Sequence, residues 1–454
     1  MCLLIRNATI VTMNPNRDVI KGDILIEKQH IKKIISRGRK ILSDTNKNKR
    51  LLSHYTKIID ATDKIVLPGF IQTHIHLCQT LFRNMAEDVE LLDWLQKYIW
   101  PSEASHSRDS LYYSALLGCA ELIKGGTTTI LDMGTVHYTD SVFEAVKESG
   151  LRGFIGKVMM DKKSKNIPDK LQDTTANSIT ESIKLYEKWH NKEDGRIKYA
   201  FAPRFVLSCS ETLLKRIRDL AIKNDLIIHS HSSENRSELA LVMKRTGYRN
   251  LEYFDKIGLT GKNLVLAHCI WLDENEIEIL KRTKTNVVHC PSSNLKLGSG
   301  IANIPEMLRQ KINVGLGADG APCNNNLSMF MEMRLSGLIQ KPFYGPKAIS
   351  SQQILEMATI NGAKALGIRD ELGCIEEGKK ADMIILNINK AQTTPFAMNN
   401  IYSSIVYSMN SENVETVIID GKIVMEDGEL KMINEKEIIK KSKKYASKIW
   451  KNVL

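Results

Sequence analysis

The feature that most constrains the fold is a repeated alternation of two kinds of segment between residues 65 and about 340. Short runs rich in β-branched and apolar residues are each followed by a longer run with apolar residues at helical spacing. Eight consecutive strand–helix units predict α/β architecture with a parallel sheet closed into a (β/α)8 TIM barrel, rather than an open doubly wound sheet. The strand candidates are residues 65–76, 127–134, 152–161, 197–204, 226–234, 263–270, 286–293 and 313–320.

Helix signals lie between these strand candidates. Ser210 precedes an apolar stripe that begins at Leu213 and Leu214, which predicts an N-cap at that serine. Gly or Asn follows or ends several helical patterns, as is common at helix C-termini. The clearest helical patterns are residues 141–149, 179–189, 210–224 and 274–282, and the terminating residues are Gly150, Asn191 and Asn224.

The two ends of the chain differ from its middle. Residues 1–64 and 376–430 consist of short strand patterns joined by turns, and neither stretch is long enough to form a comfortable sheet alone. We therefore expect them to pair into one small β-sandwich into which the barrel is inserted. The predicted units are a composite β-sandwich from 1–64 plus 370–430, a catalytic barrel over 65–369 and a C-terminal helix over 431–454.

The net charge of +12 is concentrated in residues 32–50 and 436–451. The first stretch resembles an inserted loop and the second an exposed helix, so a solvated surface is favoured over an anionic partner. No nucleic-acid-binding motif accompanies the charge, so we expect no nucleic-acid partner. The N-terminus lacks a signal-peptide pattern, no apolar run approaches ~18 residues, and the eight cysteines include no CxxC. We expect a cytoplasmic protein with reduced thiols that does not enter the membrane.

Polar residues recur where the predicted strands end. In a (β/α)8 barrel, the C-terminal ends of the strands carry the chemistry. A barrel packed for stability alone would not be expected to place histidines at four of these ends. The polar clusters are HIH at 74–76, PRF at 203–205, HSH at 229–231, AHC at 267–269, HC at 289–290 and ADG at 318–320.

His74 and His76 are two residues apart at the end of the first predicted barrel strand. Residues i and i+2 of a strand share a face, so both imidazoles can reach one metal ion. An HxH pair alone is a weak signal. His231 ends the fifth strand and supplies a third imidazole of the kind that binds zinc. His229 is predicted either to face away or to support this site from behind.

Two carboxylates stand near these histidines. Glu234 can move a proton between water and a leaving group, although a charge at the start of a helix is the alternative interpretation. Asp319 can bind metal and accept a proton. Its segment also matches GxGxxG at Gly315–Gly320, but it closes the strand–helix series instead of opening a nucleotide-binding unit, and Asp319 would repel a pyrophosphate.

His268 ends the sixth strand and is interpreted as a fourth metal neighbour or a hydrogen-bond donor to the reacting group, with simple packing as the alternative. For His289 the sequence leaves two interpretations, a role in supporting the site and a purely structural role. Taken together, three histidines and an aspartate on three strands, with acid–base groups beside them, predict a hydrolytic metal site. In such a site the metal lowers the pKa of water from about 15.7 towards ~7.

The segments LPGFIQTHIH, HSSE after His231, AHC and GADGAPCNNN resemble the amidohydrolase superfamily over nearly the whole chain. Within it, the chain is similar to deaminases of adenosine derivatives and to the related triazine hydrolases. The resemblance implies that His74, His76, His231 and Asp319 bind one divalent metal ion, zinc being favoured and iron the alternative. It further implies that Glu234 and Asp319 shuttle protons and that His268 orients the hydroxide. The fourth strand ends AFAPRF without lysine, which implies a single metal ion.

The resemblance also suggests substrate-binding residues, namely Gln79, Trp94, Glu103, Lys157 and Arg204, together with Glu234 and Asp319. Trp94 and Glu103 would contact a purine nucleoside, Glu103 through the ribose hydroxyls, although Trp94 in the core of an amphipathic helix is the alternative. Gln79 and Arg204 resemble base-binding residues of guanine deaminases. Lys157 aligns with an arginine that binds the carboxylate of S-adenosylhomocysteine, but lysine lacks the bidentate fork.

Arg204 also stands where a ribose-contacting histidine is expected. Both departures favour a 5'-modified adenosine without a carboxylate. The predicted function is hydrolytic deamination of an adenosine derivative (5'-deoxyadenosine, 5'-methylthioadenosine, adenosine or S-adenosylhomocysteine) to the inosine analogue and ammonia, in S-adenosylmethionine salvage. The enzyme would be an aminohydrolase acting on a cyclic amidine.

The enzyme alternatives are a guanine or 8-oxoguanine deaminase and a triazine chlorohydrolase. The non-enzyme alternative is an inactive scaffold relative, which would be expected to lose metal ligands that this chain keeps. The expected partners are a small purine nucleoside and further copies of the chain, as a dimer or tetramer.

Overall fold

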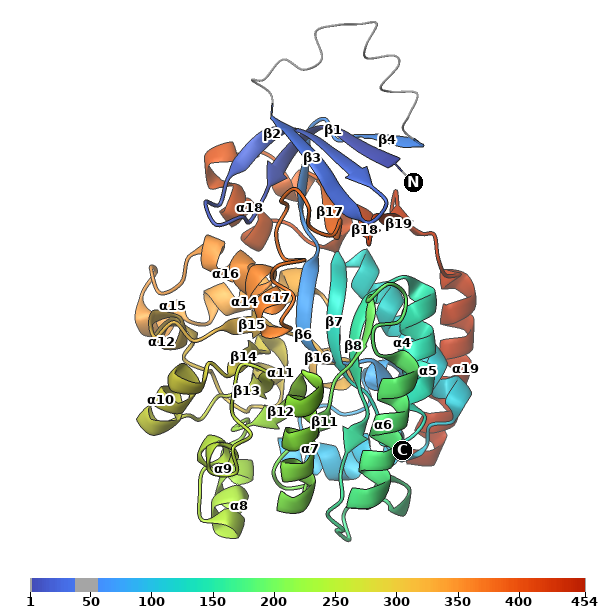
Figure 1. Cartoon of the computed structure of the whole chain (residues 1–454), viewed down its shortest axis with the longest axis vertical. Coiled ribbons are helices and arrows are strands. Elements are labelled where there is room, and N and C mark those ends of the chain that lie inside the picture. The colour runs from blue at the N-terminus through green and yellow to red at the C-terminus, as the bar shows by residue number, and fades with distance from the viewer. Residues whose placement is uncertain (1, 37–55, 454) are drawn as a thin grey trace, which may run out of the picture.

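The computed structural model describes residues 2–36 and 56–453 (Figure 1). A parallel sheet occupies the centre in the order β10-β8-β7-β6-β15-β14-β13-β12. Phe201, just beyond β10, forms a parallel bridge with Ile228 of β12, and the His229 N–H donates to the Phe201 carbonyl at 2.8 Å. These bonds link the two ends of the sheet. The strands are β6 (Phe70–His76), β7 (Thr127–Met133), β8 (Arg152–Gly156), β10 (Ile197–Tyr199), β12 (Ile228–Ser232), β13 (Leu264–His268), β14 (Asn286–His289) and β15 (Val314–Leu316).

Helices follow most of these strands along the chain and lie outside the sheet (Figure 1). The predicted cap is confirmed, because the Ser210 side chain accepts a hydrogen bond from the Leu213 N–H. Gly150 ends its helix in the left-handed region, with φ of 82°. The main helices are α4 (Arg108–Lys124), α5 (Thr139–Ser149), α6 (Thr175–Trp189), α7 (Glu211–Asn224), α8 (Arg236–Thr246), α9 (Asn250–Lys256), α10 (Glu274–Thr283), α14 (Met329–Leu338), α16 (Ser351–Met357) and α17 (Ile360–Ala365).

Several predicted strands are interrupted near their C-terminal ends. Residues 152–161 contain β8 and β9 (Val158–Met159), and residues 197–204 contain β10 and β11 (Ala202–Pro203). The last candidate divides into β15 and β16 (Asp319–Gly320). Between them, Gly317 lies so close to β6 that an added Cβ would be 2.6 Å from the His74 carbonyl oxygen. The glycines of the GxGxxG pattern therefore permit close strand packing.

The two ends of the chain share a second sheet, of order β20-β19-β18-β17-β5-β1-β2-β3, with β4 paired to β1. β5 and β17 join the two ends as antiparallel neighbours. In Figure 1 this sheet lies at one end of the parallel sheet. Its strands are β1 (Cys2–Val11), β2 (Val19–Glu27), β3 (His30–Ser36), β4 (Lys57–Asp60), β5 (Lys64–Pro68), β17 (Met383–Asn387), β18 (Val414–Ile419), β19 (Lys422–Glu426) and β20 (Glu429–Leu430).

The prediction of one strand over residues 65–76 is wrong. Residues of β5 belong to the terminal sheet and those of β6 to the parallel sheet, with the break at Gly69. A side chain at Gly69 would overlap Thr128, so the chain passes between the sheets where only glycine fits. β5 and β6 are both apolar and buried, so the apolar pattern of the sequence predicts one continuous strand.

A buried ion network fastens β8 to the terminal sheet. Arg152 Nε donates to Asp382 Oδ2 at 2.8 Å, and its Nη2 donates to Asp420 Oδ1 at 3.1 Å. Lys380 Nζ lies 3.3 Å from the same Asp420 oxygen. The side chains of Arg152, Asp382 and Asp420 are all almost fully buried. Loss of the guanidinium would leave carboxylates without compensation in a low-dielectric environment.

We expect Arg152→Met to lower the free energy of unfolding by about 3–5 kcal/mol, the usual effect of removing one partner of a buried pair. Urea unfolding followed by circular dichroism measures this loss. The control is Arg309→Met, since Arg309 is exposed and its ion pair in the described part of the chain is with Glu306, three residues before it. Equal midpoints for the two variants would contradict the importance of the Arg152 network.

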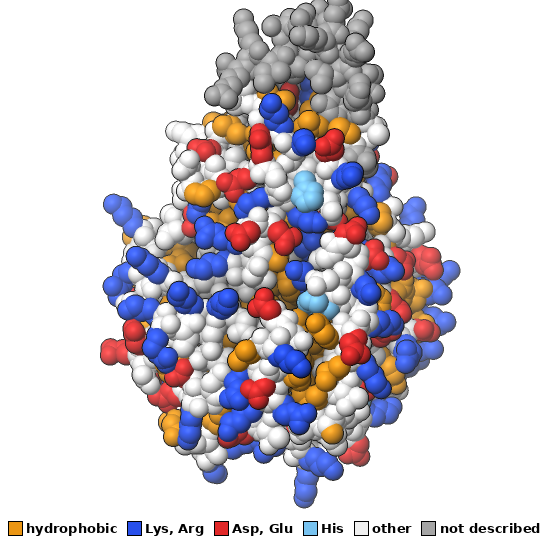
Figure 2. All heavy atoms as spheres, viewed as in Figure 1, with side chains coloured by type: hydrophobic (Ala, Val, Ile, Leu, Met, Phe, Trp, Pro, Cys, Tyr) orange, Lys and Arg blue, Asp and Glu red, His pale blue; other side chains and the backbone are white. Residues whose placement is uncertain are grey.

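The C-terminal helix α19 (Glu435–Val453) packs against α4 through one face. Its buried residues are Ile438, Ser442 and Ile449, and Trp450 Nε1 donates to the Leu81 carbonyl at 3.0 Å. Figure 2 shows Lys and Arg side chains spread among acidic and apolar ones on one face of the molecule. Within residues 2–36 and 56–453, no helix is long and apolar enough to cross a membrane. Most of the basic stretch 32–50 lies outside the described residues.

Candidate active site

The predicted metal ligands meet at the C-terminal ends of neighbouring strands. His74 and His76 lie at the end of β6, and His231 lies in β12. Asp319 opens β16, which pairs with β6 so that Asp319 stands opposite Ile75. His268 ends β13 opposite Ser232. All five side chains are nearly inaccessible to solvent except His231, which is partly exposed.

The ligand atoms face one another closely. Asp319 Oδ1 lies 3.2 Å from His74 Nε2 and 3.4 Å from His76 Nε2. His76 Nε2 and His231 Nε2 are 3.4 Å apart. Two overlapping sets have ligand atoms within 4.8 Å of one another, namely His74 with His76 and Asp319, and His74 with His231 and His268. The four predicted ligands are therefore brought together, and His268 lies beside them.

The hydrogen bonds of the histidines fit a metal site. His76 Nδ1 lies 2.8 Å from the Met133 carbonyl, and His231 Nδ1 lies 2.7 Å from the Arg204 carbonyl. A carbonyl only accepts, so each ring carries its proton on Nδ1 and has a free lone pair on Nε2. His74 Nε2 is buried with no hydrogen-bond partner in the part of the chain that the structure describes. The Nε2 lone pairs of His74, His76 and His231 are therefore free to coordinate a divalent cation.

The protonation states of the histidines and Asp319 also fit a metal site. Burial holds the pKa of His231 well below its usual range and lowers that of His76 to about 3, so both rings are neutral. Burial alone would raise the pKa of Asp319, but the surrounding histidines outweigh it and the pKa lies well below its usual range. Neutral imidazoles beside an ionised carboxylate are the protonation states that bind metal.

Glu234 stands between His268 and the cavity. Its Oε2 lies 3.5 Å from His268 Nε2, and burial raises the pKa of its carboxyl to about 7 against the opposing effect of His268. Such a carboxyl can both donate and accept a proton near neutral pH. His268 Nδ1 donates to Asn294 Oδ1 at 2.8 Å, an orientation that fixes its ring.

A small cavity of about 30 Å³ opens beside these residues. Gln79, Trp94 and Arg204 line it, as the sequence prediction required of substrate-binding residues. Glu103 stands behind this wall, where Arg204 Nη1 donates to its Oε2 at 2.7 Å and Gln79 Nε2 donates to its Oε1 at 3.0 Å. The Gln79 Oε1 and Trp94 Nε1 atoms are buried without partners in residues 2–36 and 56–453. Both therefore remain available to a ligand.

Lys157 does not line this cavity. It is buried behind Glu103 in a neighbouring hollow, where its ammonium lies 3.2 Å from Asp173 and 3.1 Å from Glu181. Two carboxylates already compensate its charge. Lys157 therefore offers no unpaired cation at the place where a substrate carboxylate was expected to bind.

Sequence reasoning missed two residues that complete the site. Glu238 lines the cavity, and its Oε2 accepts the Glu234 N–H at 3.0 Å. Glu234 precedes the N-cap Asn235 of α8 and Glu238 lies in the first turn of that helix, so helical spacing gave no signal for this contact. Ser293 donates to Asp319 Oδ2 at 2.6 Å across a gap of 26 residues, for which the sequence carries no pattern.

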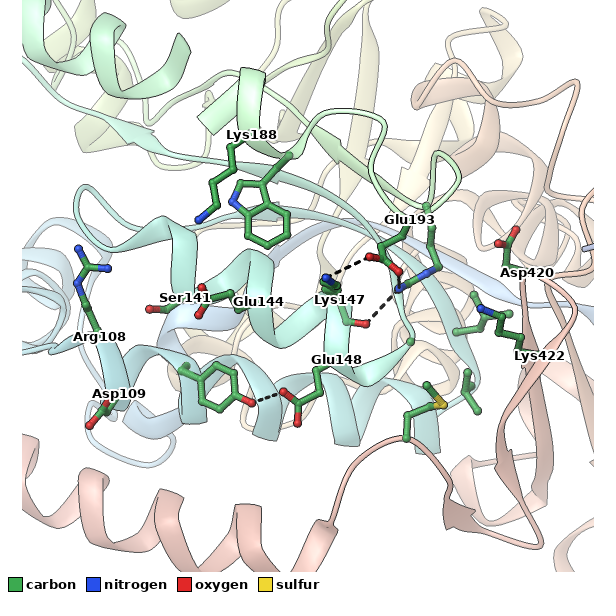
Figure 3. A pocket seen from close by; sticks show the side chains of 17 residues that line it. Arg108, Asp109, Ser141, Glu144, Lys147, Glu148, Lys188, Glu193, Asp420 and Lys422 are labelled. Carbon is green, nitrogen blue, oxygen red and sulfur yellow. Dashed lines mark hydrogen bonds and ion pairs between the residues drawn. The ribbon is translucent and has the colours of Figure 1, made fainter. Parts of the chain in front are cut away.

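A wider hollow lies elsewhere, between α4, α5 and the terminal sheet (Figure 3). Two contacts within it are a hydrogen bond from Tyr112 to Glu148 and an ion pair of Lys147 with Glu193 at 3.3 Å. It contains no histidine, whereas the cavity at the strand ends gathers three histidines with three acidic residues. The side chains that line the smaller cavity therefore make it the better candidate for the active site.

Comparison with known proteins agrees with this site. The model of the amidohydrolase family matches residues 65–424. The chain belongs to the amidohydrolase family. This amidohydrolase is 42% identical over 444 residues to a 5'-deoxyadenosine deaminase from Methanobrevibacter smithii, covering 97% of each chain. It is 39% identical over 431 residues to a 5-methylthioadenosine/S-adenosylhomocysteine deaminase from Thermococcus onnurineus, covering 95% of each.

Among solved structures, the amidohydrolase is similar to an adenosine deaminase from Xanthomonas campestris with bound zinc. The TM-score is 0.89 and the identity 27%, with 98% of each chain covered. The family resemblance predicted from the sequence is confirmed, and the His and Asp cluster is the part of this amidohydrolase that can hold a metal ion.

A buried carboxyl behind Asp319 gives a pH-dependent prediction. Glu332 of α14 accepts hydrogen bonds from the Ser292 N–H at 3.2 Å and from Asn324 Nδ2 at 2.9 Å, and burial raises its pKa to about 7 from 4.5. Between these values the folded protein binds more protons than the unfolded chain. The stability that the raised pKa contributes is therefore complete below 4.5 and is lost as pH rises through 7.

We expect the wild-type free energy of unfolding to fall between pH 5 and 8 by on the order of 2 kcal/mol more than that of Glu332→Gln, which does not titrate. Urea unfolding at several pH values measures both slopes. The control is Glu278→Gln, a surface change that should keep the wild-type slope. A Glu332→Gln slope equal to that of wild type would contradict the raised pKa.

Proposed function

We propose that this amidohydrolase is a hydrolytic deaminase of adenosine derivatives, an aminohydrolase that acts on the cyclic amidine of the purine. The single observation that carries the proposal is the cluster of His74, His76, His231 and Asp319 beside Glu234, next to a cavity that Gln79, Trp94 and Arg204 also line. The printed activities of the 42% and 39% identical relatives support the same reaction. A place in S-adenosylmethionine salvage follows from those substrates.

We further propose one divalent metal ion, zinc in preference to iron, held by His74, His76, His231 and Asp319. Support comes from the unpartnered His74 Nε2 and from the Nδ1–H bonds of His76 and His231, which leave their Nε2 atoms free. The zinc bound to the Xanthomonas relative is consistent with this choice. When bound, the ion lowers the pKa of water from about 15.7 towards about 7 and so supplies a nucleophile at neutral pH.

The residues of the chain would then divide the proton transfers. Asp319 accepts the proton of the attacking water, a role that the Ser293 hydrogen bond to its Oδ2 helps to orient. Glu234, with its pKa of about 7, gives a proton to a ring nitrogen of the purine, where it remains, and takes up the second proton of the water as the C6 carbonyl forms. The proton that Asp319 accepted passes to the leaving amine. A C6–O bond forms, the C6–N bond breaks, and ammonia leaves. His268, fixed by Asn294, orients the attacking oxygen.

Gln79, Trp94, Glu103 and Arg204 are proposed to hold the nucleoside. The free Gln79 Oε1 can accept a hydroxyl hydrogen, and the Trp94 indole can donate to the ligand. Because Lys157 is neutralised by Asp173 and Glu181, a 5' group without a carboxylate is favoured over S-adenosylhomocysteine. We propose 5'-deoxyadenosine or 5'-methylthioadenosine as the preferred substrate.

The test is a substrate panel on zinc-loaded protein, followed by the change in ultraviolet absorbance on deamination. We expect turnover of 5'-deoxyadenosine and 5'-methylthioadenosine, slower turnover of S-adenosylhomocysteine and no turnover of guanine. Failure to deaminate any adenosine derivative would refute the proposed substrate class. Preferential turnover of guanine would favour the alternative that Gln79 and Arg204 hold a free base.

For the fold we propose the finer architecture that the sequence predicted. The bond between Phe201 and β12 supports a closed (β/α)8 barrel, and the sheet shared by both chain ends supports a composite β-sandwich around its inserted position. The break at Gly69 supports an N-terminal boundary of the barrel between β5 and β6.

A further inference from the structure

His229 lies directly behind the metal cluster. Its Nε2 atom is 2.8 Å from His74 Nδ1, and the two rings meet at an angle of 85°. The side chain is fully buried. Its other nitrogen, Nδ1, has no hydrogen-bond partner in the described ranges 2–36 and 56–453. Among the described residues, the contact with His74 is therefore the one hydrogen bond of this ring.

The direction of that hydrogen bond decides whether His74 can bind a cation. If His229 donates, the proton of a neutral His74 sits on Nε2, where it faces Asp319 Oδ1 at 3.2 Å and closes the ring to metal. If His74 donates from Nδ1, its Nε2 lone pair is free. Only the second arrangement is compatible with a metal ion at His74, so His229 must then act as the acceptor and carry its own proton on Nδ1.

In this arrangement, none of the groups that accept hydrogen bonds from the three proposed histidine ligands carries a negative charge. Histidines that bind metal commonly donate their other N–H to a carboxylate, a carbonyl or water. Here His76 and His231 donate to carbonyls, and His74 would donate to a neutral imidazole. Asp319 would then be the one anionic ligand, and the supporting hydrogen-bond acceptors add no negative charge that would weaken the electrophilic character of the ion.

We propose that His229 is a positioning residue for the metal centre: its neutral imidazole accepts the His74 Nδ1–H bond and thereby holds the His74 tautomer that binds metal. The proposal rests on the metal centre of the proposed function, not on the identity of the substrate. It differs from a packing role in one respect. Packing needs only the volume of the ring, whereas positioning needs an acceptor at the place of Nε2.

Variants of similar size separate these two roles. In His229→Gln, the amide oxygen can reach the place of Nε2 and accept from His74. His229→Leu fills space but cannot accept, and His229→Asn keeps an amide that is too short to reach His74. The matched control is His289→Leu, because His289 is buried at the end of β14, two strands from β12 in the same sheet, with neither ring nitrogen hydrogen-bonded in the described residues.

The readout is the dissociation constant of zinc, measured by competition with a chromogenic chelator on the full-length protein stripped of metal. We expect His229→Leu and His229→Asn to bind zinc about 10–100-fold more weakly, the usual effect of losing such a hydrogen-bond partner. His229→Gln and His289→Leu should stay within about threefold of wild type, since both keep an acceptor beside His74.

Wild-type zinc affinity in His229→Leu would overturn the proposal, as would equal weakening in His229→Gln and His229→Asn. Should His229→Leu not fold, the comparison of His229→Gln with His229→Asn decides in the same way. Wild-type protein that binds no zinc would overturn the metal centre itself and this role with it. Zinc binding without deamination of any adenosine derivative would overturn only the proposed substrate class.

Discussion

Replacement of His74 with alanine is expected to abolish metal binding and activity together. His74 belongs to both sets of clustered ligand atoms, so its loss removes a donor from each. The metal ion contributes several kcal/mol of transition-state stabilisation, which corresponds to a fall in kcat/KM of about 10³-fold or more. Zinc content by mass spectrometry and deamination rates on the same preparation measure both effects.

The control for this prediction is His190→Ala, because His190 lies half-buried after α6 and contacts the Tyr199 N–H instead of the cluster. This variant should keep zinc and activity. Retained activity in His74→Ala after metal removal and reloading would refute the assignment of the metal centre to this cluster.

Glu234→Gln should lose activity without losing metal. Glutamine keeps the shape of the side chain but cannot exchange a proton, so kcat should fall by about 10²–10⁴-fold. Glu234 Oε2 lies 3.5 Å from His268 Nε2, so the carboxyl is beside the metal cluster. Glu234 is not one of the proposed metal ligands. Zinc content and the melting temperature should therefore stay at wild-type values.

The companion variant for Glu234→Gln is Glu306→Gln, the same chemical change on the exposed part of α12 (Ile304–Arg309), which should leave kcat unchanged. Loss of zinc in Glu234→Gln would move this residue from proton transfer to metal binding. A kcat within threefold of wild type would exclude it from the proton path.

Much of this fold follows from local patterns in the sequence. Strand and helix periodicity located all eight main strands, and the HxH pair at His74 and His76 is legible because strand residues alternate strictly. The cap at Ser210 needed only its own neighbours. The proposed metal ligands were accessible to sequence reasoning because each one lies at the end of a predicted strand.

Other features depend on contacts between distant residues and left no local signal. Arg204 and Glu103 are 101 positions apart, yet they form a buried ion pair behind the cavity wall. Lys157 appeared to be a free cation until its pairing with Asp173 and Glu181 was visible. The break at Gly69 was missed because the strand on each side of it is equally apolar.

The sheet shared by both chain ends has a consequence for synthesis on the ribosome. β5 ends at residue 68 and its antiparallel neighbour β17 begins at residue 383, a separation of about 315 residues. At 5–20 residues per second, the N-terminal strands wait roughly 15–60 s for their partner. During that time β5 presents an unpaired edge, which is a site for wrong pairing between nascent chains. Completion of this sheet is therefore a late event that only a fully synthesised chain can reach.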